Sequence, residues 1–175
     1  MKIKEKLTSF QIIILGFAGV IVIGALLLMS PVSSKAGIVT PFGKALFTST
    51  SAVCVTGLVV YDTASYWSYF GQGIILILIQ IGGLGVITVA SFVTMIAGKK
   101  ISLMQRQTMQ NSLSVPQVGG IVKHMRFIFL TSFIVEILGT LLLLPVFVSR
   151  YGIGGIWMSF FHSVSAFCNA GFDLM

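Results

Sequence analysis

Long apolar blocks without charged side chains dominate the chain. The first block is uncharged over residues 7–32 and almost wholly apolar over 12–29. A second is most apolar over 74–95, and a third covers 127–149, interrupted only by Glu136. A helix of about 20 residues crosses the hydrocarbon core of a bilayer. The pattern therefore predicts three full membrane-spanning helices.

The N-terminal block has an alternative interpretation as a secretory signal. Its flank, MKIKEK, resembles the basic start of a signal peptide, and Ser34-Lys35-Ala36 is an acceptable cleavage site. However, the apolar part of a signal is usually about 7–15 residues long, and this block is longer. We therefore favour a helix that is retained.

Two further segments, 41–58 and 157–172, are semi-apolar, rich in Ser and Thr, and too short to span. Each starts like a short helix and carries a glycine near its end. Re-entrant segments have this length and polarity, and irregular backbone at membrane depth is tolerated where it lines a watery cavity. If the three spans alternate in direction, both segments enter from the same face of the membrane.

An internal repeat relates these two segments. Sliding the chain by 114 residues places FTSTSAVCVTGL (47–58) on FHSVSAFCNAGF (161–172) with six identities in twelve positions, and it also places Pro31 on Pro145. Chance explains poorly that cysteine, glycine and proline all match at one offset. The repeating unit is then a span, a re-entrant helix, a glycine-bearing strand and a second span. This predicts a complete unit over 1–98, a cytoplasmic linker over 99–123, and a second unit over 124–175 that stops before its second span.

Composition excludes most soluble classes of protein. Of 175 residues, 56% are hydrophobic and 9% charged, and the mean hydropathy is +1.03. Soluble domains carry about 25% charged residues, so a soluble enzyme and a disordered tail are poor fits. Two cysteines cannot form a disulfide framework. An integral membrane protein remains.

The net charge of +7 would suggest nucleic acid in a soluble chain, but here it follows the positive-inside rule. Eight of the eleven basic residues fall on one side of the three alternating spans, which places the N-terminus in the cytoplasm. We therefore expect lipid, and no nucleic acid, as the surroundings. The eight residues are Lys2, Lys4, Lys6, Lys99, Lys100, Arg106, Lys123 and Arg126.

A short helix that enters the membrane and turns at a glycine is the geometry of an ion-selectivity filter. Backbone carbonyls can replace the hydration shell of a cation, and glycine permits the positive φ that aims them at one axis. Ser51 and Ser165 are placed to satisfy backbone groups at the helix ends. The competing interpretation is a pair of interfacial helices with ordinary turn glycines, and the repeat favours the filter.

The loop motifs SAVCVTGL and SAFCNAGF resemble the first two filter segments of the Trk/Ktr/HKT superfamily of K⁺ transporters. GQGIILILIQIGGLGVIT and the linker LMQRQTMQNSL are similar to those of Ktr membrane subunits. The resemblance covers essentially the whole chain. It implies an all-α integral membrane fold of M1–P–M2 (K⁺ channel-like) repeats with re-entrant pore helices.

The same resemblance implies a function: K⁺ uptake across a bacterial plasma membrane by the N-terminal half of a pore subunit. It implies a homodimer of membrane subunits, a cytoplasmic ring of nucleotide-binding RCK subunits as partner, and a missing C-terminal half. K⁺ is the transported ion, Na⁺ is a candidate regulator, and we expect no organic cofactor and no other metal. The implied ion ligands are the main-chain carbonyls of Cys54, Val55, Thr56, Gly57, Cys168, Asn169, Ala170 and Gly171.

Other interpretations stay open from the sequence. A non-transporting membrane scaffold or regulatory subunit, whose re-entrant loops only pack, is the main alternative. An intramembrane enzyme is disfavoured because no nucleophile–base motif is present. Glu136 is more consistent with a structural role than with ion coupling, and Asp62 and Asp173 could attract cations or cap turns. We attribute the glycines at 82, 83 and 85 to close helix packing.

Overall fold

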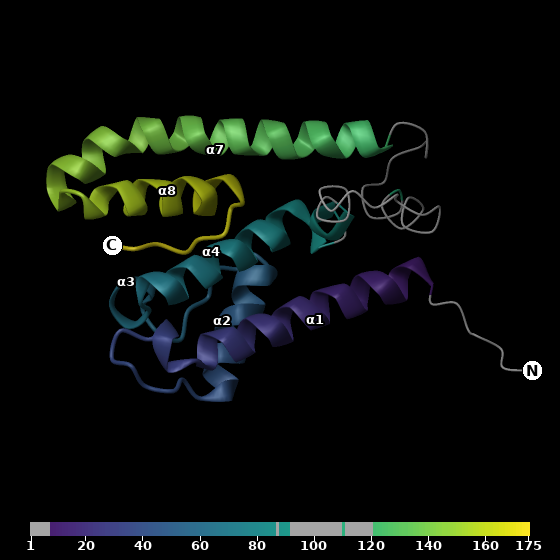
Figure 1. Cartoon of the computed structure of the whole chain (residues 1–175), viewed down its shortest axis with the longest axis horizontal. Helices are drawn as coiled ribbons and strands as arrows, with labels where there is room; N and C mark the ends of the chain where they lie inside the picture. Colours follow the sequence, from purple (N-terminus) through teal and green to yellow (C-terminus); the bar gives the residue numbers. More distant parts are fainter. Residues whose placement is uncertain (1–7, 87, 92–109, 111–120) are drawn as a thin grey trace, which may run out of the picture.

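The computed structural model describes residues 8–86, 88–91, 110 and 121–175 (Figure 1). In chain order its elements are α1 (Ser9–Met29), η1 (Pro31–Ser33), α2 (Phe42–Val53), α3 (Thr63–Tyr66), α4 (Tyr69–Leu84), α7 (Ile121–Tyr151) and α8 (Gly154–Phe167). The described residues form no strand, and an isolated bridge joins Ser34 to Trp67. Within the described residues, the regular secondary structure is all helical, as expected. The glycine-bearing strands expected after the short helices are irregular backbone instead.

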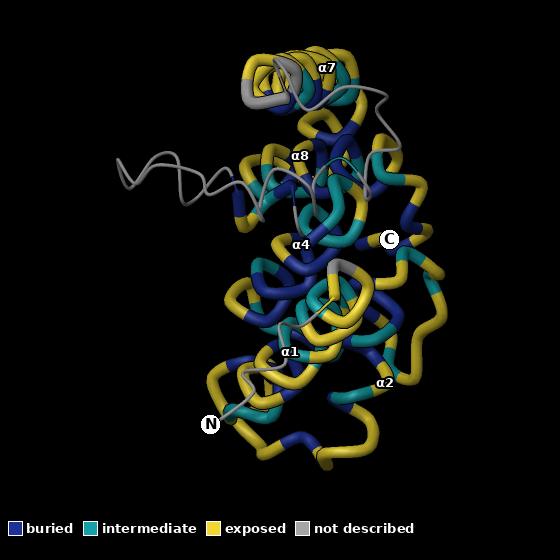
Figure 2. The backbone as a smooth tube through the Cα atoms, turned by 90° about the vertical axis from the view of Figure 1, so that its right-hand side faces the viewer, coloured by how far each residue is buried: buried dark blue, intermediate teal, exposed yellow. Residues whose placement is uncertain are grey.

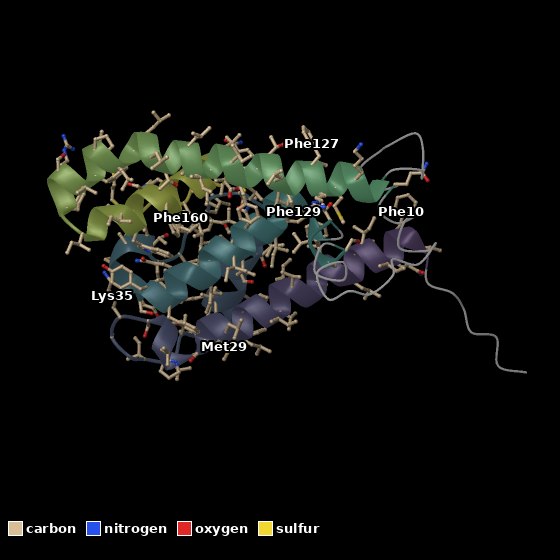
Figure 3. All side chains as sticks on the ribbon, turned by 45° about the horizontal axis from the view of Figure 1, so that its top comes forward. Phe10, Met29, Lys35, Phe127, Phe129 and Phe160 are labelled. Carbon is tan, nitrogen blue, oxygen red and sulfur yellow. The ribbon has the colours of Figure 1, made fainter. Side chains whose placement is uncertain are left out.

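Two helices, α1 and α7, are long and apolar enough to cross a membrane, over Phe10–Met29 and Met125–Tyr151. Both carry exposed apolar side chains, such as Ile14 at 66% exposure and Leu142 at 78%. Figure 3 shows the side chains of α7 projecting away from the rest of the molecule. Apolar surface of this extent is unusual in a soluble monomer and suits a lipid environment. These helices correspond to the first and third expected spans.

The second expected span, 74–95, differs from the expectation. The helix α4 begins earlier, at Tyr69, and ends at Leu84, where Gly85 adopts φ 84° and breaks it. Residues 92–95 lie outside the described part of the chain. The apolar pattern located this helix but not its break, because a glycine in an apolar run fits either an intact helix or a break. Protein covers much of α4: Ile75 and Ile79 are fully buried.

The helices are arranged around α4, which lies between α1 and α2 on one side and α7 and α8 on the other (Figures 1 and 2). α8 packs along α7 with the opposite direction, and α2 packs against α1. After α8 the chain turns back toward the end of the molecule where α8 began (Figure 1). A helix followed by a returning segment is the re-entrant path that the sequence predicted for 157–172.

Asp62 caps the short helix α3. Its carboxylate accepts hydrogen bonds from the Ser65 amide, at 2.7 Å, and from the Ser65 hydroxyl. The turn-capping role considered for Asp62 is therefore confirmed. The side-chain and backbone bonds from Ser65, together with the charge of Lys35, lower the pKa of the Asp62 carboxyl from its ordinary value of 3.8.

We expect Asp62→Ala to destabilise the protein by about 1 kcal/mol, the usual contribution of an N-cap. Because the pKa of Asp62 is lower in the folded state, its contribution is complete above its unfolded pKa and is lost as the pH falls through the folded value. Melting temperatures of the wild type and the variant should differ at neutral pH and converge in acid. A difference that persists unchanged in acid would contradict the capping role.

Candidate functional site

The two short helices α2 and α8 end in the same way. Cys54 follows α2 with φ −82° and ψ −2°, and Cys168 follows α8 with φ −75° and ψ −5°. The next residues have positive φ: 57° at Val55 and 56° at Asn169. Two positions later, Gly57 and Gly171 both have φ 73°. The backbone path therefore repeats at the offset of 114 residues that the sequence motifs share. We call residues 54–58 and 168–172 the twin loops.

Hydrogen bonds at the start of the twin loops also repeat. The Thr56 amide donates to the Ser51 carbonyl at 3.0 Å, and the Ala170 amide donates to the Ser165 carbonyl at 2.7 Å. The preceding amides, of Val55 and of Asn169, each bond the carbonyl three residues earlier. This pair of bonds is the Schellman motif, which normally places Gly or Asn at the left-handed position.

Val55 is therefore an unexpected residue at its position. A β-branched residue with positive φ is a genuine outlier, and such strained residues concentrate at functional sites. The sequence pointed to the glycines as the residues with positive φ. Asparagine at 169 offered a signal for the left-handed position, whereas nothing about valine at 55 did.

The main-chain carbonyls of the first four residues of each twin loop accept no hydrogen bond within the described part of the chain. Among the residues that the structure describes, no hydrogen bond ends on the carbonyls of 54–57 or 168–171. The amides at the start of each loop are directed back into the helix cap. Each loop thus contains carbonyl oxygens that have no hydrogen-bond partner among the described residues.

The twin loops lie against each other. A Cβ atom at position 57 would be 2.6 Å from the Ala170 carbonyl oxygen and 3.1 Å from the Gly171 Cα. A Cβ atom at position 171 would be 3.5 Å from the Gly57 Cα. The close approach of the two backbones at this point requires glycine at 57.

The helix α4 supports both loops through adjacent glycines. A Cβ atom at Gly82 would lie 2.1 Å from the Val53 carbonyl oxygen, at the end of α2. A Cβ atom at Gly83 would lie 2.6 Å from the Cys168 Sγ, at the end of α8. The interpretation of these two glycines as packing positions is confirmed, and each serves one loop.

The predicted supporting serines have different partners. The Ser51 hydroxyl lies 3.0 Å from the Thr56 hydroxyl, and the Ser165 hydroxyl donates to the Phe172 carbonyl at 2.6 Å. Each therefore joins the end of its short helix to the loop that follows. Cys54 and Cys168 are free thiols, the first exposed and the second half-buried.

Two other serines attach the short helices to the long ones. Ser49 Oγ donates to the Ile21 carbonyl at 2.8 Å, and Ser163 Oγ donates to the Glu136 carbonyl at 2.6 Å. The bonded positions on the long helices are 115 residues apart, not 114. Pro31 opens η1, whereas Pro145 lies inside α7. The proline match at offset 114 therefore does not correspond to a shared structure.

Sequence reasoning missed two glutamines of α4. Gln72 is buried, donates to the Trp67 carbonyl at 3.2 Å, and accepts from the Trp157 indole at 2.8 Å, so it joins α4 to α8. Gln80 donates to Glu136 at 2.7 Å. Gln72 lies between two glycines and Gln80 between two isoleucines, and neither setting indicates which helix the glutamine would face.

The sequence matches the TrkH family, described as cation transport protein, over residues 4–175. It is 42% identical over 175 residues to the potassium/sodium uptake protein NtpJ of Enterococcus hirae, covering 99% of this chain and 39% of that protein. It is 44% identical over 170 residues to the Ktr system potassium uptake protein B of Bacillus subtilis, covering 97% and 38%. The protein of the same name from Vibrio alginolyticus is 36% identical over 165 residues, covering 94% and 36%. The chain thus spans about two fifths of the length of these relatives.

Proposed function

Because the chain belongs to the TrkH family of cation transport proteins, we propose that it forms part of the pore of a K⁺ uptake system. Family membership confirms the resemblance drawn from the loop motifs. The chain is a transport protein and not an enzyme, as its similarity to potassium uptake proteins indicates. K⁺ is the proposed cargo.

The observation that carries this proposal is the pair of twin loops with free carbonyls. A dehydrated cation needs several oxygen ligands at once. The carbonyls of 54–57 and 168–171 are unbonded within the described part of the chain, and their two backbones touch at Gly57. We propose these eight carbonyls as the ligands that K⁺ meets in a selectivity filter.

The proposed architecture follows the M1–P–M2 pattern. In the first repeat (1–98), α1 is the first span, α2 the pore helix, and α4 with the residues after it the second span. After the linker (99–123), α7 and α8 take the first two roles again in 124–175. Two loops supply only part of a ring of ligands, so other sequence must complete the pore, either in a longer form of this chain or in a partner.

The proposed setting is the plasma membrane of a bacterium, with the N-terminus in the cytoplasm. Two of the relatives carry names of Ktr systems, which implies partner subunits. For this chain we propose a homodimer of membrane subunits over a cytoplasmic ring of nucleotide-binding RCK subunits. We also propose Na⁺ as a regulator. The name of one relative refers to uptake of both potassium and sodium.

The test is growth on K⁺. The complete reading frame that encodes this chain should restore growth at low K⁺ to bacteria that lack their own K⁺ uptake systems, when an RCK partner is supplied. Uptake of labelled Rb⁺ into the same cells should rise above that of cells with an empty vector. Normal amounts of the protein in the membrane without growth or uptake would contradict the proposal and favour the scaffold alternative.

A further inference from the structure

A buried carboxylate on α7 is connected to the second of the twin loops through α4. Glu136 is 1% exposed, and its Oε1 accepts a hydrogen bond from Gln80 Nε2 at 2.7 Å. The other end of the same amide, Gln80 Oε1, accepts from the Cys168 thiol at 3.7 Å, within the range for sulfur. The chain of contacts therefore runs from α7 through α4 to the residue where α8 ends.

The contact at Glu136 can be compared with the equivalent contact in the first repeat. Ser49 bonds the carbonyl of Ile21 just as Ser163 bonds the carbonyl of Glu136. A glycine lies beside each of these contacts. A Cβ added at Gly24 would be 2.5 Å from Ser49 Oγ, and one added at Gly139 would be 2.4 Å from Ser163 Oγ. In the first repeat, the short helix α2 is attached to α1 in the same way although an isoleucine, Ile21, stands where the second repeat has Glu136. The carboxylate at 136 must serve something other than this attachment, because burying it is costly.

The first repeat also differs at the cysteine. Cys54 is exposed, whereas Cys168 is partly buried and in contact with Gln80 and Gly83. The two loops share a backbone path, but the cysteines at their starts differ in their contacts with α4. The polar chain of contacts belongs to the second loop.

We propose that Glu136 and Gln80 are positioning residues that hold Cys168, and with it the second loop of the proposed filter, at a fixed place against α4. This inference rests on the proposed function. Glu136 Oε1 accepts from the Gln80 amide, which directs the amide nitrogen toward α7. The amide oxygen is then directed toward the Cys168 thiol. Without Glu136 the amide is free to turn, and its nitrogen cannot accept from the thiol.

The experiment compares four single variants and one double variant in the complete pore with its partner. Gln80→Leu removes the central link, and Glu136→Leu removes the acceptor on α7. Glu136→Gln keeps an acceptor oxygen for Gln80 but removes the carboxylate. Thr140→Val is the matched control, because the Thr140 hydroxyl donates to the Glu136 main-chain carbonyl at 2.8 Å within the same helix, and not to the Glu136 carboxyl group. Each is assayed for membrane abundance and for the ratio of K⁺ to Na⁺ uptake.

We expect Gln80→Leu and Glu136→Leu to lower the K⁺/Na⁺ ratio about fivefold, the effect of one lost hydrogen bond. Glu136→Gln should retain most of the wild-type ratio, and Thr140→Val should leave it unchanged. The double variant Gln80→Leu with Glu136→Leu removes both polar groups, so its abundance should recover toward the wild type while its ratio stays low. That separation distinguishes positioning from a cost of burial alone.

Other outcomes would overturn the inference. An unchanged ratio in Gln80→Leu and Glu136→Leu, at normal abundance, shows that the second loop does not depend on these residues. A ratio that recovers with abundance in the double variant assigns the effect to stability. If the wild type itself fails to take up K⁺, the proposed function fails first, so the two failures are distinguishable.

Discussion

Gly57→Ser in the complete pore should abolish discrimination between K⁺ and Na⁺ and strongly reduce K⁺ uptake. The new Cβ would lie 2.6 Å from the Ala170 carbonyl oxygen, which belongs to the other loop and is a proposed ion ligand. The residue would also be held at φ 73°, which costs an L-residue roughly 1–2 kcal/mol. Together these effects predict at least a roughly tenfold loss of K⁺/Na⁺ selectivity.

Gly171→Ser should have a smaller effect in the same direction. Its backbone has the same φ, but its Cβ would meet the Gly57 Cα at 3.5 Å, an ordinary contact. The measurement is competition between Na⁺ and labelled Rb⁺ for uptake. Gly37→Ala is the matched control, because Gly37 also has positive φ, 68°, but no atom lies within 4 Å of its added Cβ. Wild-type selectivity in both serine variants would sink the filter assignment.

Gly82→Val should prevent assembly of the protein. A Cβ at this position would lie 2.1 Å from the Val53 carbonyl oxygen and 2.8 Å from its carbon. Both are backbone atoms at the end of α2, so no side-chain rotation relieves the overlap. Either α4 or α2 must shift, and overpacking of this kind costs typically 1–3 kcal/mol and occasionally more.

The measurement for Gly82→Val is the amount of monodisperse protein recovered from membranes by size-exclusion chromatography, which should fall to near zero. Gly73→Ala is the control in the same helix, because nothing lies within 4 Å of its added Cβ. Since alanine favours a helix over glycine by up to about 1 kcal/mol, this control should be recovered at least as well as the wild type. Normal recovery of Gly82→Val would contradict the packing described for α4.

The sequence predicted the parts of this fold that depend on chemically distinctive residues. Cysteine and glycine at matching positions located the twin loops, and the structure gives those loops one backbone path. The apolar blocks located α1 and α7. The break at Gly85 was not predicted, because a glycine in an apolar run is compatible with either an intact helix or a break.

The tertiary contacts of the site were less predictable. The positive φ at Val55 follows from the cap of α2 and the neighbouring loop, and valine by itself disfavours it. The partner of Glu136 depends on the rotation of α4 about its axis, which its almost uniformly apolar sequence does not specify. The proline match was misleading in another way. Pro31 and Pro145 match at one offset, but the first opens η1 and the second lies inside α7.

The segments that connect the long helices to the short ones indicate how the two repeats arose. From Gly24 to Ser49 the chain takes 25 steps, through η1 and a loop. From Gly139 to Ser163 it takes 24, through the rest of α7, a short turn and the first part of α8. The anchoring contacts at the two ends are nevertheless the same. Duplication of a single ancestral unit would leave this pattern, in which the connectors differ in length and conformation and the serine attachment is shared.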